Sequence, residues 1–253
     1  FVNGWLEHTG DYAALELLNF YKAYRALVRA KVALFSLAHQ TDAVQKAVTL
    51  RQYRNYANLA ESYSAIPSNF LVITNGVSAV GKSHVAMRLV EALGAIRLRS
   101  DVERKRLFGE QKDADLGKLS AGIYTQDASA ATYQRLHQLA DAALHAGFPV
   151  VIDATYLKQA QREAASQVAE ACGAPFLILE CSAPDEVIAS WLEQRKAAGS
   201  DPSDATMDVV HAQQASREAL TDDELLHSKR VDTHESASLD TLIARIRQRL
   251  TGL

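Results

Sequence analysis

Eight consecutive residues have the composition of a phosphate-binding loop. Gly76-Val-Ser-Ala-Val-Gly81-Lys82-Ser83 matches G-x-x-x-x-G-K-[ST] at every specified position. In such a loop the backbone N–H groups and the start of the following helix bind phosphate oxygens. Lys82 is expected to reach the β- and γ-phosphates, and the Ser83 hydroxyl to ligate Mg²⁺. The expected nucleotide-binding residues are Gly76, Val77, Ser78, Ala79, Val80, Gly81, Lys82, Ser83 and His84.

A carboxylate ends the apolar stretch Val150-Val-Ile-Asp153. A carboxylate at the end of a buried strand is typical of the residue that holds Mg²⁺ beside a phosphate-binding loop, directly or through water. We therefore predict that Asp153 and Ser83 share the metal. The alternative is that Asp153 caps the helix that follows Thr155.

A second carboxylate, Asp101, follows the short stretch 95–99. Transfer of a phosphoryl group to a hydroxyl requires a group that orients the hydroxyl and accepts its proton. A carboxylate across the site from the γ-phosphate can do both, so Asp101 is the predicted general base. The alternative is that Asp101 caps a helix that starts at Val102.

Three arginines are candidates for contacts with anionic groups. Arg104 lies three residues after Asp101 and is expected to bind an anionic group of the acceptor. Arg195 precedes a Gly-Ser-Asp-Pro break and suits a lid that closes over the phosphates, where its charge would stabilise the transition state. Arg162 is a further candidate substrate contact. Each of them taken alone also fits an ordinary surface charge.

Alternating strand and helix patterns must position these residues. From Phe70 onward, expected strands at 70–73, 95–99, 150–153, 175–181 and 229–233 are separated by helical patterns. This alternation predicts an α/β fold with a parallel sheet and helices on both faces. In such a sheet ligands bind beyond the carboxyl ends of the strands. The loop and the two carboxylates are therefore expected to meet there.

The first 65 residues have a different character. Helical periodicity without Pro or Gly covers residues 11–39, and a second helix is expected from an N-cap at Thr41 to about Ser62. Together these segments predict a helical hairpin. Pro67 marks the change of periodicity, so we assign residues 1–65 to a helical segment and residues 68–253 to the nucleotide-binding domain.

Composition limits the classes of partner and compartment. The chain has 253 residues, a formal net charge of -3 and a pI near 6.3, which gives no overall electrostatic case for nucleic-acid or membrane binding. Cys172 and Cys181 fit no zinc pattern and no disulfide framework, so free thiols in a reducing cytoplasm are expected. No 18-residue apolar run is present. The chain begins with Phe1, in mid-pattern, so residues upstream in a longer protein are expected.

The sequence resembles a group of small P-loop kinases that includes polynucleotide 5′-kinases, chloramphenicol phosphotransferase, gluconate kinase and zeta toxins. The resemblance rests on the loop at 76–83, Ser100-Asp101-x-x-Arg104, Val151-Ile-Asp153-Ala-Thr155 with Arg162 downstream, and Arg195. It implies a P-loop NTPase three-layer fold with sheet order 2-3-1-4-5. It also implies that the aspartate after the second strand, here Asp101, is the base for the acceptor hydroxyl.

A second resemblance covers nearly the whole chain. Phe20-Tyr-Lys-Ala-Tyr-Arg-Ala-Leu-Val-Arg-Ala-Lys31 followed by this domain is similar to the bifunctional aminoglycoside phosphotransferase/ATP-binding protein family. The resemblance implies that the N-terminal helices are the last helices of a protein-kinase-like domain. The Gly-rich loop and the His-x-Asp and Asp-Phe-Gly motifs of that domain are not in this chain and would lie upstream of it. Only the P-loop half could then act.

Together these features predict an ATP-dependent phosphotransferase that uses Mg²⁺ and moves the γ-phosphate to a hydroxyl of a small molecule or a nucleic-acid 5′ end. The alternative is an ATPase or ATP-binding module that regulates a missing or partner phosphotransferase domain. No Asn-Lys-x-Asp motif for guanine is present, which argues against GTP. The acceptor stays open, because variable loops such as 109–125 would build its pocket.

Overall fold

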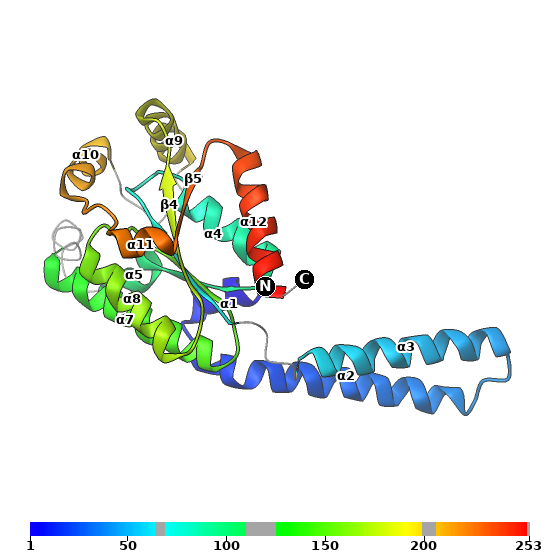
Figure 1. The fold of residues 1–253 in the computed structure, drawn as a ribbon. Coiled ribbons are helices and arrows are strands. Elements are labelled where there is room, and N and C mark those ends of the chain that lie inside the picture. The colour runs from blue at the N-terminus through cyan, green and yellow to red at the C-terminus, as the bar shows by residue number, and fades with distance from the viewer. Residues whose placement is uncertain (64–68, 110–124, 199–205, 252–253) are drawn as a thin grey trace. The chain divides into compact units, whose positions relative to one another are not determined.

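The structure is a computed structural model that describes residues 1–63, 69–109, 125–198 and 206–251. Strands and helices alternate from residue 71 onward (Figure 1). In chain order the elements are α1 (Val2–Thr9), the 3-10 helix η1 (Tyr12–Ala14), α2 (Leu15–Leu37), α3 (Ala43–Ser62), β1 (Leu71–Asn75), α4 (Lys82–Leu93), β2 (Ile96–Arg99), α5 (Ser100–Phe108), α7 (Gln126–His145), β3 (Val150–Asp153), α8 (Gln159–Ala171), β4 (Phe176–Ser182), α9 (Asp185–Ala198), α10 (Met207–Ser216), α11 (Asp222–Leu226), β5 (Ser228–Asp232) and α12 (Ser236–Thr251).

The five strands form one sheet in the order β2-β3-β1-β4-β5, and every pairing is parallel. Ile73 of the central strand pairs with Ile152 on one side and Ile178 on the other. At the carboxyl edge Arg99 of β2 pairs with Asp153 of β3. The predicted α/β fold and its 2-3-1-4-5 order are therefore confirmed. The order brings the end of β1, which leads into the phosphate-binding loop, next to the end of β3.

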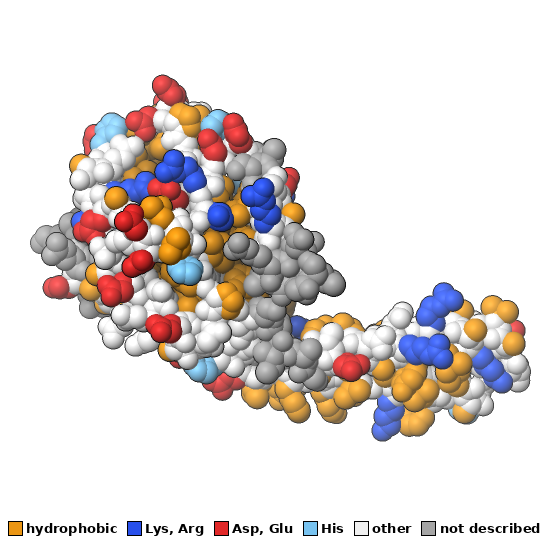
Figure 2. Space-filling view, in the orientation of Figure 1, with side chains coloured by type: hydrophobic (Ala, Val, Ile, Leu, Met, Phe, Trp, Pro, Cys, Tyr) orange, Lys and Arg blue, Asp and Glu red, His pale blue; other side chains and the backbone are white. Residues whose placement is uncertain are grey.

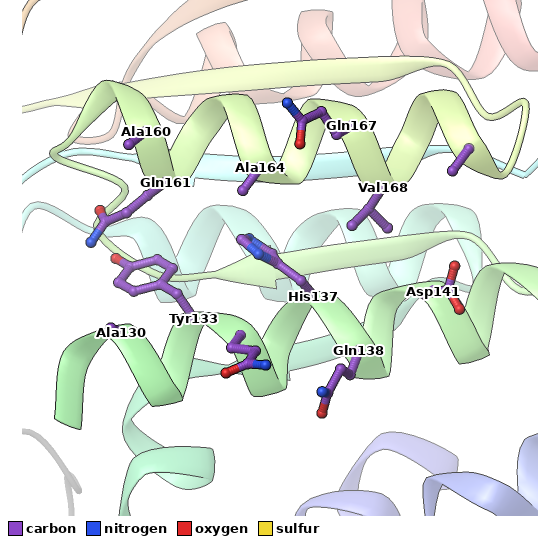
Figure 3. Close-up of a pocket in the computed structure, with 12 residues that line it drawn as sticks. Ala130, Tyr133, His137, Gln138, Asp141, Ala160, Gln161, Ala164, Gln167 and Val168 are labelled. Atoms are coloured by element: carbon purple, nitrogen blue, oxygen red, sulfur yellow. The ribbon is translucent and has the colours of Figure 1, made fainter. Parts of the chain in front are cut away.

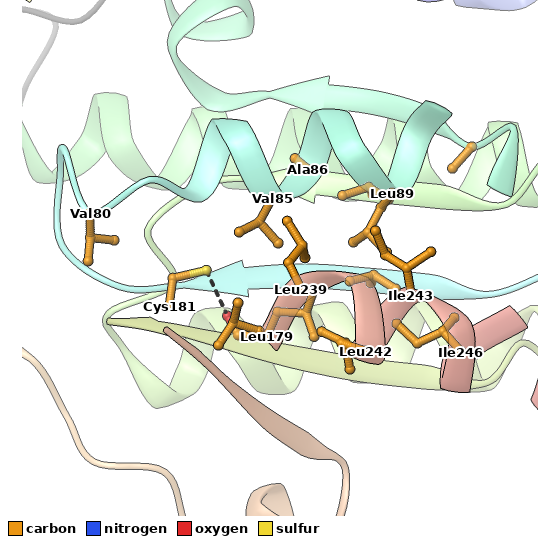
Figure 4. Close-up of a cluster of buried hydrophobic side chains, with 14 of the residues drawn as sticks. Val80, Val85, Ala86, Leu89, Leu179, Cys181, Leu239, Leu242, Ile243 and Ile246 are labelled. Atoms are coloured by element: carbon orange, nitrogen blue, oxygen red, sulfur yellow. Dashed lines mark hydrogen bonds between the residues drawn. The ribbon is translucent and has the colours of Figure 1, made fainter. Parts of the chain in front are cut away.

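Helices cover both faces of the sheet. On one face α4 and α12 pack against β1, β3 and β4, as Figure 4 shows for Leu89, Leu179 and Ile243. The last helix buries one apolar side, formed by Leu239, Leu242, Ile243 and Ile246. The other face carries α7 and α8 (Figure 1). Burial of a leucine or isoleucine side chain contributes about 1.5–3 kcal/mol, so these layers hold the loop ends firmly.

The chain divides into two compact units, residues 1–10 with 68–253, and residues 11–67. In the first unit α1 lies along the outer strand β2. The Asn3 side chain donates to the carbonyl oxygen of Ala95 at 3.0 Å and accepts from the N–H of Arg97 at 2.6 Å. Leu6 is fully buried. Residues 1–10 thus belong to the same compact unit as the parallel sheet, whereas the sequence analysis grouped them with the helical segment. The assignment of residues 1–65 and 68–253 to two functional domains stays a prediction.

The second unit contains the predicted helical hairpin, formed by α2 and α3. Its second helix is capped by Asp42 instead of Thr41, since the Asp42 carboxylate accepts from the N–H groups of Val44 and Gln45. Many large apolar side chains on these two helices are exposed, and Figure 2 shows them as orange patches along the hairpin. They include Leu17, Phe20, Tyr21, Tyr24, Leu27, Phe35 and Val44. The unit therefore offers an apolar surface.

Among the helices that the structure describes, none is both long enough and apolar enough to cross a membrane.

Candidate active site

The loop between β1 and α4 has an unusual backbone that tertiary contacts hold in place. Three of its residues have positive φ, Gly76 at 147°, Ala79 at 62° and Gly81 at 88°. The Gly76 N–H donates to the carbonyl oxygen of Thr155 at 3.0 Å, and the Thr233 hydroxyl donates to the carbonyl oxygen of Val80 at 2.7 Å. A positive φ at a residue such as Ala79 is strained and persists only where its surroundings enforce it. The loop is therefore preformed.

Replacing Gly76 by alanine is expected to abolish ATP binding and to lower the melting temperature. A Cβ at this position would lie 2.7 Å from the carbonyl oxygen of Cys181, and its φ of 147° is a conformation open mainly to glycine. Calorimetric titration with ATP and a thermal melt measure the two effects. Gly94→Ala is the matched control, because φ there is also positive at 68° but nothing lies within 4 Å. Wild-type ATP affinity in Gly76→Ala would contradict the expected crowding.

Lys82 begins helix α4 and points back along the loop. Its Nζ donates to the carbonyl oxygen of Val77 at 2.6 Å, and the residue is buried, with 8% of its surface exposed. The contact holds the ammonium group at the mouth of the loop. The loop and the start of α4 thus concentrate positive potential in one place, where a polyphosphate would be attracted.

A small polar pocket brings together residues from the carboxyl edges of three strands. Its lining comes from the loop and α4, from the start of α5 after β2, and from the end of β3. The lining residues are Ser78, Ala79, Gly81, Lys82, Ser83, Ser100, Asp101, Asp153, Ala154 and Thr155. The three groups that the sequence singled out, the loop and the two carboxylates, therefore share one pocket.

Asp153 is paired with an arginine that the sequence analysis did not single out. Arg97 of β2 donates from Nη2 to Asp153 Oδ2 at 2.6 Å and from Nε at 3.2 Å, and only 5% of its surface is exposed. Arg99 Nε lies 4.0 Å from the same oxygen. These cations offset the charge of the carboxylate. The available signal in the sequence was an arginine between Ile96 and Leu98 of a short strand, since a buried guanidinium needs an anionic partner.

The pocket fits a magnesium ion by the chemistry of its donors. Ser83, Asp101 and Asp153 all line it and supply hydroxyl and carboxylate oxygens. Such hard oxygen ligands are the ones that Mg²⁺ prefers, alongside phosphate oxygens and water.

Asp101 lies in the first turn of α5, which starts at Ser100 with Arg99 at the N-cap position. The structure thus places Asp101 inside the helix and not at its cap. Burial raises the pKa of the Asp101 carboxyl, and the nearby charge of Asp153 raises it further, while Lys82, Arg104 and Arg99 act in the opposite direction. A raised pKa makes a carboxylate a better proton acceptor in its ionised state. Asp101 therefore lines the pocket with a carboxyl that holds its proton more strongly than an ordinary aspartate.

Arg104 lies on the same helix and is half-buried. Its charge acts on Asp101, which places it near the pocket, although it is not among the lining residues. His84, in the first turn of α4, is exposed. Arg195 belongs to α9, but its side chain lies outside the described residues, as do residues 110–124 of the expected loop at 109–125.

Arg162 does not face the pocket. Its side chain is buried and makes a two-pronged contact with Glu224, from Nε at 2.7 Å and from Nη2 at 2.9 Å. Its remaining donors bind the backbone carbonyl oxygens of Tyr156, Glu218 and Ala219. With its donors engaged in this way, the geometry favours a structural role for Arg162 over the substrate contact that the sequence suggested.

Two further residues touch the pocket lining. The Tyr133 hydroxyl on α7 contacts the Thr155 hydroxyl at 3.0 Å and accepts from the N–H of Tyr156 at 3.0 Å. The Gln213 side chain on α10 accepts from the N–H of Ser78 at 2.6 Å. Neither has a sequence motif, because each reaches the pocket from a helix far along the chain.

The fold and the pocket define a P-loop nucleotide-binding protein with a kinase-like fold. A family model described as an AAA domain matches residues 71–220. The chain belongs to this AAA domain family.

Its curated relatives are longer proteins. An uncharacterized protein of Mycobacterium tuberculosis is 30% identical over 225 residues, which cover 85% of this chain and 42% of that protein. An uncharacterized protein of Mycobacterium bovis matches with the same figures. The chain therefore spans less than half the length of these relatives.

Solved structures support the fold. A sugar kinase from Janibacter sp. is 22% identical with a TM-score of 0.51, over 73% of this chain and 95% of that chain. A gluconokinase from Sinorhizobium meliloti is 18% identical with a TM-score of 0.51, over 72% and 98%. At these identities the likeness concerns the fold and leaves the acceptor open.

Proposed function

We propose that this chain is an ATP-dependent phosphotransferase that moves the γ-phosphate of ATP to a hydroxyl of a small molecule or of a nucleic-acid 5′ end. The observation that carries the proposal is the single pocket shared by Lys82, Asp153 and Asp101. A protein that only binds a nucleotide needs the lysine and one metal-binding carboxylate, but it has no need of a second carboxylate in the pocket. A second, half-buried carboxylate with a raised pKa suits proton transfer from an acceptor.

Each residue then has a distinct task. The loop N–H groups and Lys82 hold the phosphates, while Ser83 and Asp153 would hold Mg²⁺, which neutralises charge on the β- and γ-phosphate oxygens when bound. Asp101 orients the acceptor hydroxyl and takes its proton as the new O–P bond forms and ADP leaves. Arg195 is proposed for the lid and Arg104 for an anionic group of the acceptor.

Transfer of label from γ-labelled ATP tests the proposal. The protein is incubated with Mg²⁺ and, separately, with a small-molecule extract and with RNA bearing 5′-hydroxyl ends. A labelled organic product supports the proposal and supplies the acceptor for identification. Label released only as inorganic phosphate in every pool would overturn it.

The second candidate is the ATP-binding module that regulates a phosphotransferase domain. The exposed aromatic side chains of α2, such as Phe20, Tyr24 and Phe35, favour it, because they offer a surface for another part of a longer protein. The longer relatives agree with such a partner. The resemblance to the bifunctional aminoglycoside phosphotransferase/ATP-binding protein family suggests that this partner is a protein-kinase-like domain. Nucleotide binding without any labelled product is the outcome that this candidate requires.

At acid pH, the pH dependence of kcat/KM is expected to follow the ionisation of the Asp101 carboxyl. The base works when ionised, so kcat/KM should rise with pH through the Asp101 pKa, above the ordinary aspartate value of about 3.9. The Arg104 charge lowers this pKa. Arg104→Gln should therefore move the acid limb to higher pH, measured with the acceptor found by label transfer. Lys105→Gln, an exposed neighbour on the same helix, is the control. An unmoved limb in Arg104→Gln would argue against Asp101 as the titrating base.

A further inference from the structure

A cluster of three metal-binding side chains lies between α7 and α8. Asp141 and His145 come from the last turns of α7, and Cys172 follows the end of α8. Figure 3 shows the two helices side by side, with Asp141 near the end of the groove between them. Both helices lead the chain back to the amino ends of strands, β3 and β4. The cluster therefore lies at the opposite edge of the sheet from the phosphate pocket.

The three donor atoms have the spacing of ligands around one metal ion. Cys172 Sγ lies 3.4 Å from Asp141 Oδ1 and 3.7 Å from His145 Nδ1, and those two atoms are 3.4 Å apart. In a tetrahedral zinc site with bonds of about 2.0–2.3 Å, neighbouring ligand atoms are about 3.3–3.6 Å apart. The triangle thus matches three corners of such a tetrahedron before any ion is bound.

We propose that Asp141, His145 and Cys172 form a zinc-binding site, with water at the fourth position. Thiolate and imidazole ligands favour Zn²⁺ over the hard cations Mg²⁺ and Ca²⁺. The four-residue spacing places Asp141 and His145 on one side of their helix. The spacing of the two cysteines did not indicate this site, because only one of them, Cys172, belongs to it. The other two ligands lie on a different helix, and the fold brings the three together.

Two local interactions must change when the ion binds. Burial, together with the hydrogen bond and the charge of Asp141, raises the pKa of the Cys172 thiol to about 11. The ion must therefore displace the thiol proton. His145 Nδ1 also lies 2.9 Å from the backbone carbonyl oxygen of Asp141 and must give up this hydrogen bond to bind the ion, which is feasible because water can replace it at a side chain that is 65% exposed. The bound ion would join the ends of α7 and α8.

Cobalt titration of the whole chain tests the site, with Co²⁺ as a spectroscopic substitute for Zn²⁺. The expected result is one equivalent of Co²⁺ bound with a thiolate-to-cobalt charge-transfer band, bleached by added Zn²⁺. Zinc should also raise the melting temperature, because an ion that binds only the folded state stabilises it. Absence of the band in the wild-type protein would overturn the proposal.

Single replacements identify the ligands. Cys172→Ala should lose the band and the zinc-dependent rise in melting temperature, while Cys181→Ala, which changes the other cysteine, should keep both. His145→Ala should weaken cobalt binding at least tenfold, and His211→Ala, a change at another exposed histidine, should not. A band that survives in Cys172→Ala, or disappears in Cys181→Ala, would contradict the assignment. Circular dichroism confirms that each variant is folded.

Discussion

Replacing Asp101 by asparagine is expected to reduce phosphoryl transfer by about 10²–10⁴-fold, the usual contribution of a positioned general base. Asparagine has the same shape and can still orient a hydroxyl, but it cannot take the proton. ATP affinity should be nearly unchanged, because Lys82 and the loop N–H groups stay in place. Transfer is measured with labelled ATP and affinity by calorimetric titration.

The same replacement should not destabilise the fold at pH 7. Because burial and Asp153 raise the Asp101 pKa in the folded protein, folding favours the protonated form, and this contribution to stability is lost as pH rises through the folded pKa. Asparagine removes this half-buried charge, so the melting temperature at pH 7 is expected to be equal to or above that of the wild type. Asp223→Asn, at an exposed position on α11, is the control. Loss of transfer together with a lowered melting temperature would indicate a structural role for Asp101.

Replacing Arg162 by methionine is expected to lower the free energy of unfolding by about 3–5 kcal/mol, the usual cost of removing one partner of a buried ion pair. The change would leave Glu224 without its two-pronged contact and the carbonyl oxygens of Glu218 and Ala219 without the Arg162 donors, while Tyr156 would keep its bond from Asn75. Burying such groups without hydrogen bonds is unfavourable. Urea unfolding followed by circular dichroism measures the loss.

An exposed ion pair is the matched control. Arg230 also contacts a glutamate, Glu180, at 3.1 Å, but its side chain is 75% exposed, so Arg230→Met should cost less than about 1 kcal/mol. The double variant Arg162→Met with Glu224→Leu should recover part of the loss, since it removes the unpaired charge as well. A cost for Arg162→Met as small as that of Arg230→Met would show that the buried pair contributes little.

The parts of the site that sequence could predict are local or follow from topology. The phosphate-binding loop is a contiguous pattern whose flanking strand and helix are visible beside it. Asp101 and Asp153 end or follow strands, and parallel strands place such residues at one edge of the sheet. The alternation of strands and helices indicated the α/β class, while the strand order came from a family resemblance. Both agree with the structure.

The parts that sequence could not predict depend on which distant segments meet. Gln213 reaches Ser78 across 135 residues, and Arg97 reaches Asp153 across 56. Arg162 resembles any other helical arginine until α11 brings Glu224 to it. Thr41 and Asp42 are both good N-cap residues, and the local pattern does not choose between neighbours.

The attachment of α1 to β2 has a consequence for the protein in solution. A strand at the border of a sheet presents unpaired N–H and C=O groups, which can recruit a strand of another molecule and start aggregation. The Asn3 carboxamide occupies the outward-facing groups of Ala95 and Arg97 with two hydrogen bonds, as a neighbouring strand would. The short helix α1 thus protects this border from intermolecular strand pairing, a task unrelated to nucleotide chemistry.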